Sequence, residues 1–533
     1  MYVRQTRGLP LIRMQSKGKR TVRSVILSAT MLLFAAPAVA QRDIDFGPLA
    51  LPQDGNVMVP VVEGERFSGL AASLDEQTGG ALAMAAAEAG FTGAKSETLT
   101  LFGVKPYTRV DLIGVGANKL DRVAAEDFGG TAASLNDGAS GTDVSILWGA
   151  VERDDDAGAA RVAFGFLLGD YRFDRYQEDR LDPAARGAVV ILSDDAGAST
   201  QFNDDLAHLA ASVYFARNLS TEPGNVIYPQ SFVDRVRREF RGLDSVSIEV
   251  LDERDLARLG MGAHLGVGGG SARPPRLLVI EYLAGGDEAP AVLAGKGITF
   301  DTGGVSLKEN ENMWRMKGDM TGAAVVSATV LAAARRGARV NVVALAAMAE
   351  NMPSGSAIRP GDVLTSMSGK TIEISSTDAE GRLVLADAVH YGQVEYAPEV
   401  LIDVATLTGS VYRALGDTHA GLFSRHDELA ERLRDAAAAA GESTWRLPLD
   451  DTHFELIQAD VADIVNGGIS GAGASIGAAF IGSFVAEGQA WAHFDIASVY
   501  FTERGTPTVP IGFSGWGVRA LDEYLRRHHQ SGP

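Results

Sequence analysis

The decisive stretches of this chain are AGKGITFDTGGVSLKENENMWRMKGDM (294–320) and SSTDAEGRLVLADAV (375–389). Both place charged side chains at glycine-rich turns beside apolar segments. Charges in such places are costly unless metal ions or one another neutralise them. Four carboxylates around two lysines predict a pair of divalent cations with a positively charged electrophile beside them, an arrangement that activates water. The charged residues are Lys296, Asp301, Lys308, Asp319, Asp378, Glu380 and Arg382.

Strand-like and helical segments alternate around these two stretches. This alternation predicts an α/β fold with a mixed, largely parallel sheet flanked by helices. In such sheets the reactive site lies beyond the carboxyl ends of the strands, where we expect Asp301 and Asp403. The predicted strands are Leu277–Tyr282, Ala291–Ile298, Val340–Ala346 and Val400–Val404, and the predicted helices are Thr321–Arg335, Glu380–Gln393 and Asp427–Ala440.

The first half of the chain predicts a smaller α/β domain without a chemical motif. A helical segment, 204–217, then leads into TEPGN (221–225), where proline and glycine end it. We place the domain boundary in this region and assign 41–200 to an N-terminal domain and 201–533 to a larger C-terminal catalytic domain. Predicted elements of the first domain are strands Val57–Val62, Ser96–Phe102, Thr108–Gly114, Val162–Leu168 and Ala188–Leu192, with a helix at Gly80–Ala89.

The first 40 residues differ from the rest of the chain. They carry seven basic residues and no acidic one, and an apolar run, VILSATMLLFAAP (25–37), precedes an Ala-Val-Ala sequence. This order predicts a secretory signal peptide, residues 1–40, cleaved before Gln41. The alternative is a membrane anchor, but the run is too short to span a bilayer comfortably. We therefore expect an exported protein, periplasmic or secreted, with no stable membrane anchor.

Composition argues against some partners. Hydrophobic residues make up 46% and charged residues 22% of the 533, as in an ordinary soluble globular protein. Without the leader, 41 basic residues stand against 68 acidic ones, a net charge of about −27. Such a chain is repelled by nucleic acid, so no nucleic-acid partner is expected. The chain has no cysteine, so cysteine usage says nothing about its redox compartment.

The charged residues also have structural interpretations. Asp319 is placed to cap the helix that follows it, and Thr377 with Glu380 fits a capping box. Capping leaves Asp378, the arginine and the two lysines unexplained. Hard oxygen ligands suit Mg²⁺ or Mn²⁺, and a dinuclear site with an amine ligand also takes Zn²⁺. Lys296 ligates only as a neutral amine, which nearby divalent charge favours; otherwise it is a solvated turn lysine.

Three other patterns carry less weight. GASIG (473–477) matches a nucleophile elbow with Ser475, but a glycine-rich loop precedes it where a strand is required. GVGGG (266–270) is like a phosphate loop, but no helix is expected to begin after it. His493, between apolar residues, is expected to be structural. A serine hydrolase that uses Ser475 is the rival these patterns leave open.

Taken together, the motifs resemble the leucine aminopeptidase family, di-metal exopeptidases that remove N-terminal amino acids. STDAEGRL (376–383) is similar to the family's NTDAEGRL signature, and GKGITFDTGG, SLK and KGDM are similar to its other metal-binding block. The resemblance runs from about Gly165 to the C-terminus. It implies peptide substrates and a homohexamer. Supporting stretches are YRFDRY (171–176), NLSTEPGNV (218–226), 349–373, DVATLTG (403–409) and WAHFDIA (491–497).

The resemblance also implies roles for residues and two divalent ions per subunit, Mn²⁺ or Zn²⁺ with Mg²⁺ as an alternative. One ion would be held by Lys296, Asp301, Asp319 and Glu380, and the other by Asp301, Asp378 and Glu380. Lys308 would polarise the scissile carbonyl, and Arg382 would hold a bicarbonate ion as general base. The pocket for the substrate's first side chain would be lined by Met316, Thr406, Leu407 and Gly409.

The chain departs from the family pattern in places that bear on substrate preference. Ser376 replaces the asparagine of the signature, Ala472–Ala474 interrupts a glycine-rich loop, and SGW (514–516) precedes the final GVRAL. Export is a further departure, because the family is mostly cytosolic. The rival from another class is a DNA-binding protein on the same scaffold, against which the net charge argues.

Overall fold

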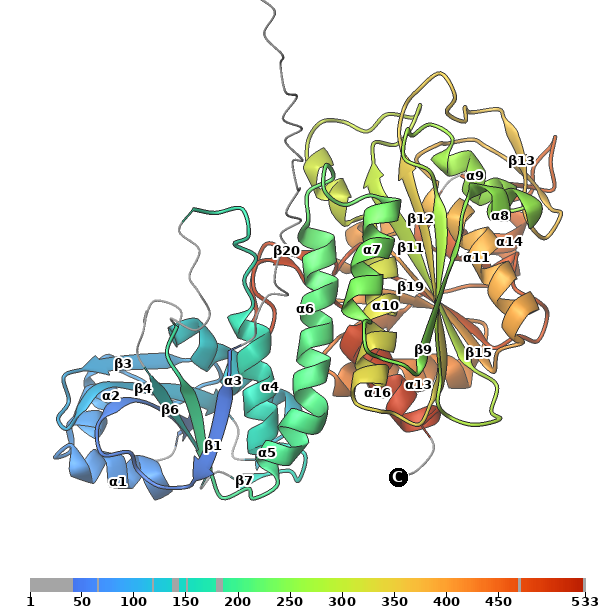
Figure 1. Cartoon of the computed structure of the whole chain (residues 1–533). Coiled ribbons are helices and arrows are strands. Elements are labelled where there is room, and N and C mark those ends of the chain that lie inside the picture. Colours follow the sequence, from blue (N-terminus) through green and yellow to red (C-terminus); the bar gives the residue numbers. More distant parts are fainter. Residues whose placement is uncertain are drawn as a thin grey trace, which may run out of the picture. The chain divides into compact units, whose positions relative to one another are not determined.

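The computed structural model describes residues 42–64, 67–116, 119–136, 143–149, 152–178, 186–467 and 471–530. The predicted signal peptide lies outside the described residues. Two large sheets with flanking helices form most of the described part, as the sequence predicted, and three small sheets accompany them (Figure 1). Across these ranges no helix combines the length and the apolar character needed to cross a membrane.

The first sheet lies within the predicted N-terminal domain. Its described strands are β1 (Ile44–Pro48), β2 (Gly55–Val62), β3 (Thr98–Phe102), β4 (Tyr107–Gly116), β6 (Val144–Trp148) and β8 (Val189–Ser193). They run in the order β1-β8-β6-β2-β4-β3, and only β3 pairs antiparallel, with β4. A short pair, β5 (Lys119–Leu120) with β7 (Glu152–Arg153), stands apart. The helices are α1 (Gly69–Gln77), α2 (Ala81–Ala89), α3 (Arg122–Asn136), α4 (Ala159–Asp170) and α5 (Ala198–Gln201).

The second sheet lies within the predicted catalytic domain. Its strands are β9 (Val246–Leu251), β10 (Arg276–Leu283), β11 (Ala291–Asp301), β12 (Asn341–Asn351), β15 (Val400–Ala405), β16 (Ala420–Phe423), β17 (Thr444–Arg446) and β19 (Trp491–Asp495). They run in the order β17-β16-β19-β15-β11-β12-β10-β9. The central four, β19 to β12, are parallel to one another. The boundary between the domains, placed at residue 200, stays a prediction.

The helices of the second part follow the alternation expected from the sequence. They are η2 (Phe202–Leu206), α6 (Ala207–Thr221), α7 (Pro229–Glu239), α8 (Glu253–Arg258), α9 (Gly262–Gly268), η3 (Met313–Gly318), α10 (Thr321–Arg335), α11 (Gly381–Tyr396), α12 (Gly409–Leu415), α13 (Asp427–Ala439), α14 (Asp451–Glu455), α15 (Gly473–Gly482) and α16 (Val518–His528). Small strands complete it: β13 (Val363–Thr365), β14 (Thr371–Glu373), β18 (Ile464–Val465), β20 (Phe501–Thr502) and β21 (Gly512–Phe513).

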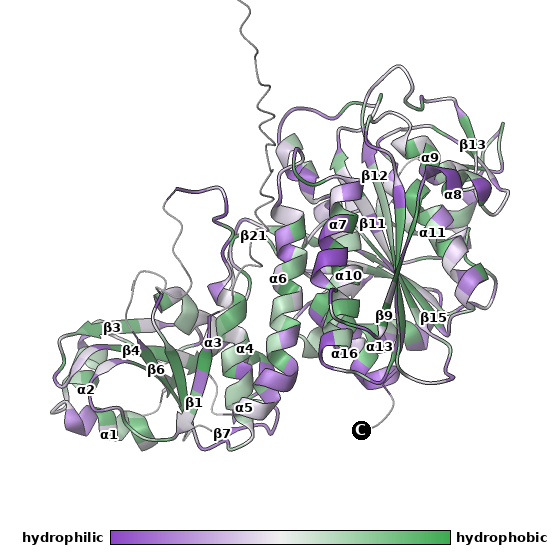
Figure 2. Cartoon of the chain, in the orientation of Figure 1, coloured by the Kyte–Doolittle hydropathy of each residue, from purple (hydrophilic) through white to green (hydrophobic). Residues whose placement is uncertain are grey.

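The central strands are apolar on both faces because helices cover both. Alternate side chains of a strand point to opposite faces. Leu293 of β11 packs in the same core cluster as α10, whereas its neighbours Val292 and Ala294 pack with α11. The strands of a sheet covered on both sides therefore have continuous apolar sequences, which appear green in Figure 2.

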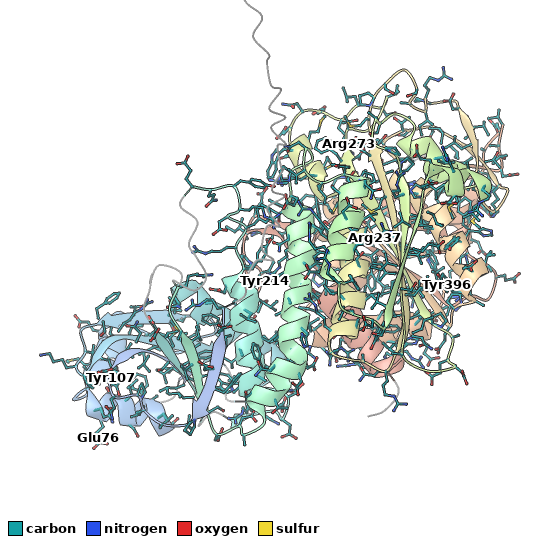
Figure 3. The ribbon with its side chains drawn as sticks, in the orientation of Figure 1. Glu76, Tyr107, Tyr214, Arg237, Arg273 and Tyr396 are labelled. Atoms are coloured by element: carbon teal, nitrogen blue, oxygen red, sulfur yellow. The ribbon has the colours of Figure 1, made fainter. Side chains whose placement is uncertain are left out.

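The prediction of a strand at Val162–Leu168 is wrong, because this segment belongs to helix α4. Nearly every residue of α4 is buried, so the segment has no polar face to reveal a helical period. Helix α4 packs closely against α3 because glycine at the contact leaves room for the other backbone. A Cβ on Gly165 would lie 2.0 Å from the Glu126 carbonyl oxygen. On another side, Tyr214 of α6 donates a hydrogen bond to the Leu167 carbonyl (Figure 3).

Helices α3 and α16 are joined by a buried ion pair between segments far apart in the sequence. Arg122 Nη1 lies 2.7 Å from Glu523 Oε2, and Arg527 Nε lies 2.7 Å from the other oxygen. Burial by itself would raise the pKa of Glu523, but Arg122 and Arg527 outweigh it and lower the pKa to about 2. A carboxylate with a lowered pKa stabilises the fold above its ordinary pKa of 4.5, and this contribution is lost as pH falls toward 2.

Replacing this carboxylate is expected to remove an acid-sensitive part of the stability. Glu523→Gln should lower the free energy of unfolding at pH 7 by about 2 kcal/mol, the scale of a hydrogen bond between charged groups. The difference from wild type should shrink as pH falls below about 5. Chemical denaturation at pH 7, 5 and 4 measures both effects. A difference that stays constant over this range would contradict the assignment.

Candidate functional site

The site lies where the parallel strands of the second sheet end. Asp301 ends β11, Asn351 ends the neighbouring β12 and pairs with it in register, and Asp495 ends β19. Thr406 follows the last residue of β15. Because the carboxyl ends of parallel strands meet at one edge, these polar residues converge there. Asp403, which we expected at this edge, lies inside β15 instead. Its carboxylate is hydrogen-bonded to Trp491 Nε1 (2.8 Å) and His493 Nδ1 (2.6 Å).

Local backbone irregularity aims Asp301 into the site. The register between β11 and β12 shifts between Ile298 and Asp301, and such a bulge redirects a side chain. Gly303 and Gly304 then take left-handed conformations, with φ of +85° and +65°. A Cβ on Gly303 would lie 2.9 Å from Asp378 Oδ1, so only glycine lets the two stretches meet here.

Lys296 is buried in β11, which excludes the solvated-turn interpretation. Its Nζ lies 2.8 Å from Asp319 Oδ2 and 2.8 Å from Glu380 Oε1, and it donates to the Thr406 carbonyl at 2.9 Å. Glycines bring these groups close. A Cβ on Gly322 of α10 would lie 2.1 Å from the Val404 carbonyl oxygen, so α10 sits directly on the sheet and holds Asp319 beside it.

The capping interpretations of Asp319 and Glu380 are both wrong. Met320 is the N-cap residue of α10 and the helix has no side-chain cap. Glu380 occupies the N-cap position of α11, but its carboxylate forms no cap hydrogen bond. Thr377 instead joins the two stretches: its hydroxyl donates to the Gly303 carbonyl at 2.6 Å and accepts from the Ser306 amide at 2.7 Å.

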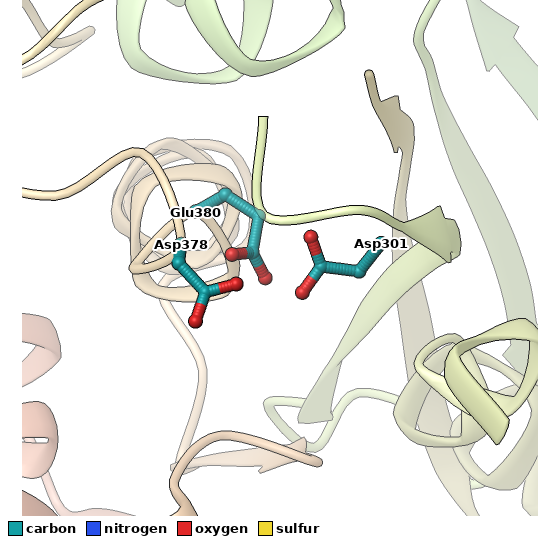
Figure 4. A group of neighbouring side chains, drawn as sticks. All are labelled: Asp301, Asp378 and Glu380. Carbon is teal, nitrogen blue, oxygen red and sulfur yellow. The ribbon is translucent and has the colours of Figure 1, made fainter. Parts of the chain in front are cut away.

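Three carboxylates form a cluster with the spacing of a metal site (Figure 4). One oxygen from each of Asp301, Asp378 and Glu380 lies within 4.8 Å of the others. Lys308 joins the cluster, with its Nζ 2.9 Å from Asp301 Oδ2 and in contact with Asp378 Oδ1. Asp301 is 2% exposed, whereas the Asp378 side chain is 36% exposed. The cluster is therefore closed on the side of the sheet and open on the side of Asp378.

The charges within this cluster do not balance. With Asp319, which pairs with Lys296, four carboxylates meet two lysines. Burial and the nearby Glu380 raise the pKa of Asp301 to about 6, and burial raises the pKa of Asp319 well above its ordinary value. Burial disfavours the charged form of Lys296, but Asp319 and Glu380 outweigh it, so the pKa of the lysine is raised. Four carboxylates thus face two ammonium groups, which leaves the described side chains of the site short of positive charge.

Glu380 has an oxygen free for a further partner. Its Oε1 contacts Lys296, whereas its Oε2 is buried and has no hydrogen-bond partner among the described residues. Burial by itself would raise the pKa of Glu380, but Lys296 and Lys308 outweigh it and lower the pKa. An ionised carboxylate oxygen that is buried and unpartnered costs free energy unless a cation approaches it.

Arg382 lies in the first turn of α11, 7% exposed. Its Nη1 donates to the Asn466 carbonyl at 2.6 Å, and its buried Nε has no partner in the described part of the chain. Burial lowers its pKa to about 10, so it remains a cation at neutral pH. A guanidinium with unused donors is suited to binding a small planar anion.

The residues predicted to bind substrate lie on two segments beside the cluster. Thr406 contacts it directly, because its hydroxyl donates to Asp319 Oδ1 at 2.7 Å. Leu407 is half-buried, and its amide donates to Asp495 Oδ1 at 3.0 Å. Gly409 begins α12, and the half-buried Met316 lies in η3. Their roles as a specificity pocket stay predictions.

Sequence reasoning missed three polar residues that hold the site together. Asn351 Nδ2 donates to Asp301 Oδ1 at 2.8 Å and to the Thr377 carbonyl at 3.0 Å. Asn466 is fully buried beside Asp378 and Arg382, and Asp495 accepts bonds from the segment after β15. Asn351 and Asp495 could have been found from their positions at strand ends.

The nucleophile-elbow and phosphate-loop motifs do not have the local structure that their chemistry would require. Ser475 is buried inside α15 rather than exposed at a strand-to-helix turn. The glycines at 266 and 268 lie within α9, which ends at Gly268. His493 is fully buried in β19 and hydrogen-bonded to Asp403, in keeping with the structural role expected for it. Elbow and phosphate-loop interpretations are thus both unsupported.

Comparison with known families agrees with the fold and the site. The catalytic-domain model of the cytosol aminopeptidase family matches residues 214–522, and the N-terminal-domain model of the same family matches residues 58–180. This chain belongs to the cytosol aminopeptidase family and is an aminopeptidase, which hydrolyses the N-terminal peptide bond of peptides.

Relatives cover nearly the full chain. A probable cytosol aminopeptidase of Caulobacter vibrioides is 41% identical over 90% of this chain and 98% of its own length. Another, from Brucella suis, is 41% identical over 92% of this chain and 99% of its own. Among solved structures, a mutant of tomato leucine aminopeptidase is 28% identical, with a TM-score of 0.82 over 92% of this chain and 98% of that one. The bottromycin maturation enzyme BotP in complex with Mn is 29% identical, with a TM-score of 0.78 over 89% and 99%.

Adding one methyl group beside Lys296 is expected to disturb the site. A Cβ on Gly381 would lie 2.5 Å from Lys296 Cε and 2.7 Å from its Nζ. Gly381→Ala should therefore push the lysine from Asp319 and Glu380 and cost about 1–3 kcal/mol of stability. Denaturation and peptidase assays measure the two effects. Gly355→Ala, in an open loop position, is the control and should change neither. Unchanged activity in Gly381→Ala would contradict the assigned contact.

Proposed function

We propose that this aminopeptidase works with two divalent metal ions held by the cluster around Asp301 and Glu380. The charge imbalance carries the proposal: two positive charges face four carboxylates, and Glu380 Oε2 is buried with no hydrogen-bond partner in the described part of the chain. Oxygen ligands in this number suit Mn²⁺, Mg²⁺ or Zn²⁺. The Mn in the related BotP complex supports metal binding in this family.

The residues present fit two ions. Asp301 and Glu380 lie between the remaining groups, and under this proposal they would help to hold both ions. Asp319 and Lys296 lie on one side of them, and Asp378 lies on the other. Lys296 would ligate as a neutral amine, in place of the ammonium that pairs with Asp319 and Glu380 in the absence of metal. When bound, such ions lower the pKa of water and attract the free amino group of a peptide.

Lys308 is proposed to stabilise negative charge on the scissile carbonyl. Its Nζ contacts Asp301 and Asp378, and its side chain is 24% exposed, on the open side of the cluster. A cation held at that edge faces a substrate that enters past Asp378. Charge placed beforehand where an oxyanion develops is an effective form of transition-state stabilisation.

Arg382 is proposed to hold a bicarbonate ion that acts as general base. The proposed metal ligands are committed to ion pairs, and His493 is sequestered by Asp403. The arginine has an unpartnered Nε among the described residues, and it remains charged. Its planar fork matches the geometry of bicarbonate.

The substrates are proposed to be peptides with a free amino terminus and a side chain accepted between Met316 and the 406–409 segment. The likeness to tomato leucine aminopeptidase favours a leucyl-type preference. The chain is also proposed to be exported by its N-terminal 40 residues and to assemble as a homohexamer, in keeping with the family resemblance. Fractionation of cells that express the full chain, and the mass of the purified protein in solution, test these two points.

Hydrolysis of leucine p-nitroanilide by the purified chain tests the proposal directly. Chelation should abolish cleavage, and adding back Mn²⁺ or Zn²⁺ should restore it. N-acetyl-leucine p-nitroanilide should not be cleaved, because it lacks the free amine. Cleavage that survives complete removal of metal would contradict the metal proposal, and cleavage of the acetylated substrate would contradict the exopeptidase specificity.

A lysine variant tests the charge stabilisation assigned to Lys308. Lys308→Ala should lower kcat by about 100-fold or more, as loss of an oxyanion donor does. Lys370→Ala, which removes an exposed lysine that donates to the Ser483 carbonyl, is the matched control and should leave kcat unchanged. Equal kcat in wild type and Lys308→Ala would overturn the role assigned to Lys308.

A further inference from the structure

Asn466 is a buried neutral residue at the junction of three parts of the site. It follows β18 and is 0% exposed. Its amide N–H donates to the Glu373 carbonyl at 3.0 Å, which ties it to the end of β14. Its side chain carries no charge and has no role in the proposed chemistry, so neither accounts for its burial.

The side chain of Asn466 holds the loop that carries Asp378. Its Oδ1 accepts from the Ser375 amide (2.9 Å), the Ser375 hydroxyl (3.3 Å) and the Ser376 amide (3.3 Å). Its Nδ2 donates to the carbonyls of Ser376 (2.7 Å) and Ala379 (3.3 Å). The amide group thus bonds backbone groups that flank Asp378 on both sides, together with the Ser375 hydroxyl.

The main chain of Asn466 holds Arg382. Its carbonyl accepts from Arg382 Nη1 at 2.6 Å, and this is the hydrogen bond that fixes the guanidinium among the described residues. A single residue therefore links the loop of one proposed metal ligand to the proposed anion-binding arginine. Moving either partner would move the other.

The neighbouring Gly467 shows how closely this contact is built. A Cβ at this position would lie 2.1 Å from the Ser375 hydroxyl oxygen and 3.4 Å from the Ser375 Cβ. An alanine here would force the Ser375 hydroxyl to turn away from Asn466 Oδ1 or the 375–379 loop to shift. The close approach of the two segments therefore favours glycine at 467.

We propose that Asn466 is a positioning residue that sets the distance between Asp378 and Arg382, so that metal binding and the proposed base act on the same peptide bond. The inference rests on the proposed two-metal function. Residues that orient metal ligands commonly change metal affinity or activity by about 10–100-fold when they are replaced.

Asn466→Ala is the direct test, with Asn341→Ala as the matched control. Asn341 is also a buried asparagine that clamps a loop: it accepts from the Gly285 amide (2.8 Å) and donates to the carbonyls of Gly286 (2.9 Å) and Glu288 (2.7 Å). It begins β12, at the end opposite Asn351. Asn466→Ala removes five side-chain hydrogen bonds and Asn341→Ala removes three, but only Asn466 lies beside the site.

The readouts are Mn²⁺ affinity by equilibrium titration, and kcat and KM at saturating Mn²⁺. Asn466→Ala should weaken Mn²⁺ binding by about 10–100-fold and lower kcat more than it changes KM. Asn341→Ala should lose stability yet keep both values near wild type. If Asn466→Ala keeps wild-type affinity and kcat, the inference is overturned. A wild-type protein that neither binds Mn²⁺ nor cleaves the substrate would instead refute the proposed function.

A second pair of variants tests the inference even if Asn466→Ala does not fold. Gly467→Ala should reproduce part of its loss of Mn²⁺ affinity and kcat, because the added methyl displaces the Ser375 hydroxyl that lies against Asn466 Oδ1. Ser375→Ala removes the hydroxyl that would be struck and should be nearly neutral alone, since Ser375 is exposed. The double variant should recover most of the wild-type values. Failure of Ser375→Ala to rescue Gly467→Ala would overturn the positioning role.

Discussion

The structure of the catalytic part is organised around the burial of unequal charge at the edge of a parallel sheet. Lys296 joins Asp319 to Glu380, and Lys308 joins Asp301 to Asp378, so each lysine binds segments that are distant in the sequence. Buried charges of this kind are tolerated only when partners and geometry are fixed. The sheet, its two helical layers and the glycine turns supply that fixed geometry.

Glycine explains how so many charged side chains fit into so little space. Gly322 lets α10 lie against β11 and β15, and Gly381 leaves room for the Lys296 side chain. Gly303 and Gly304 turn the chain back in a left-handed conformation that other residues rarely adopt. The glycine-rich character of the two decisive stretches is thus a packing requirement of the site and not a sign of a flexible loop.

The sequence predicted the parts of this arrangement that depend on local pattern and charge. Thr321–Arg335 was predicted with its observed bounds, because its apolar run begins after a polar turn and ends at basic residues. The prediction from sequence was wrong for Val162–Leu168, because this helix is buried on all sides and its sequence shows no alternation of apolar and polar faces. Asn351 and Asn466 escaped notice because a neutral amide shows no signature of its own. Their importance comes from strand register and from loops brought together only in the fold.

The same charge imbalance couples metal binding to stability. Without cations, the raised pKa values of Asp301 and Asp319 mean that ionising these groups at neutral pH works against the folded state. Cations that bind only the folded form stabilise it by mass action, so the proposed metals would act on folding as well as on chemistry. Residues such as Asn466 matter in this view because they keep the ligands in place before the ions arrive. Binding energy then goes into holding the metals instead of ordering the loop.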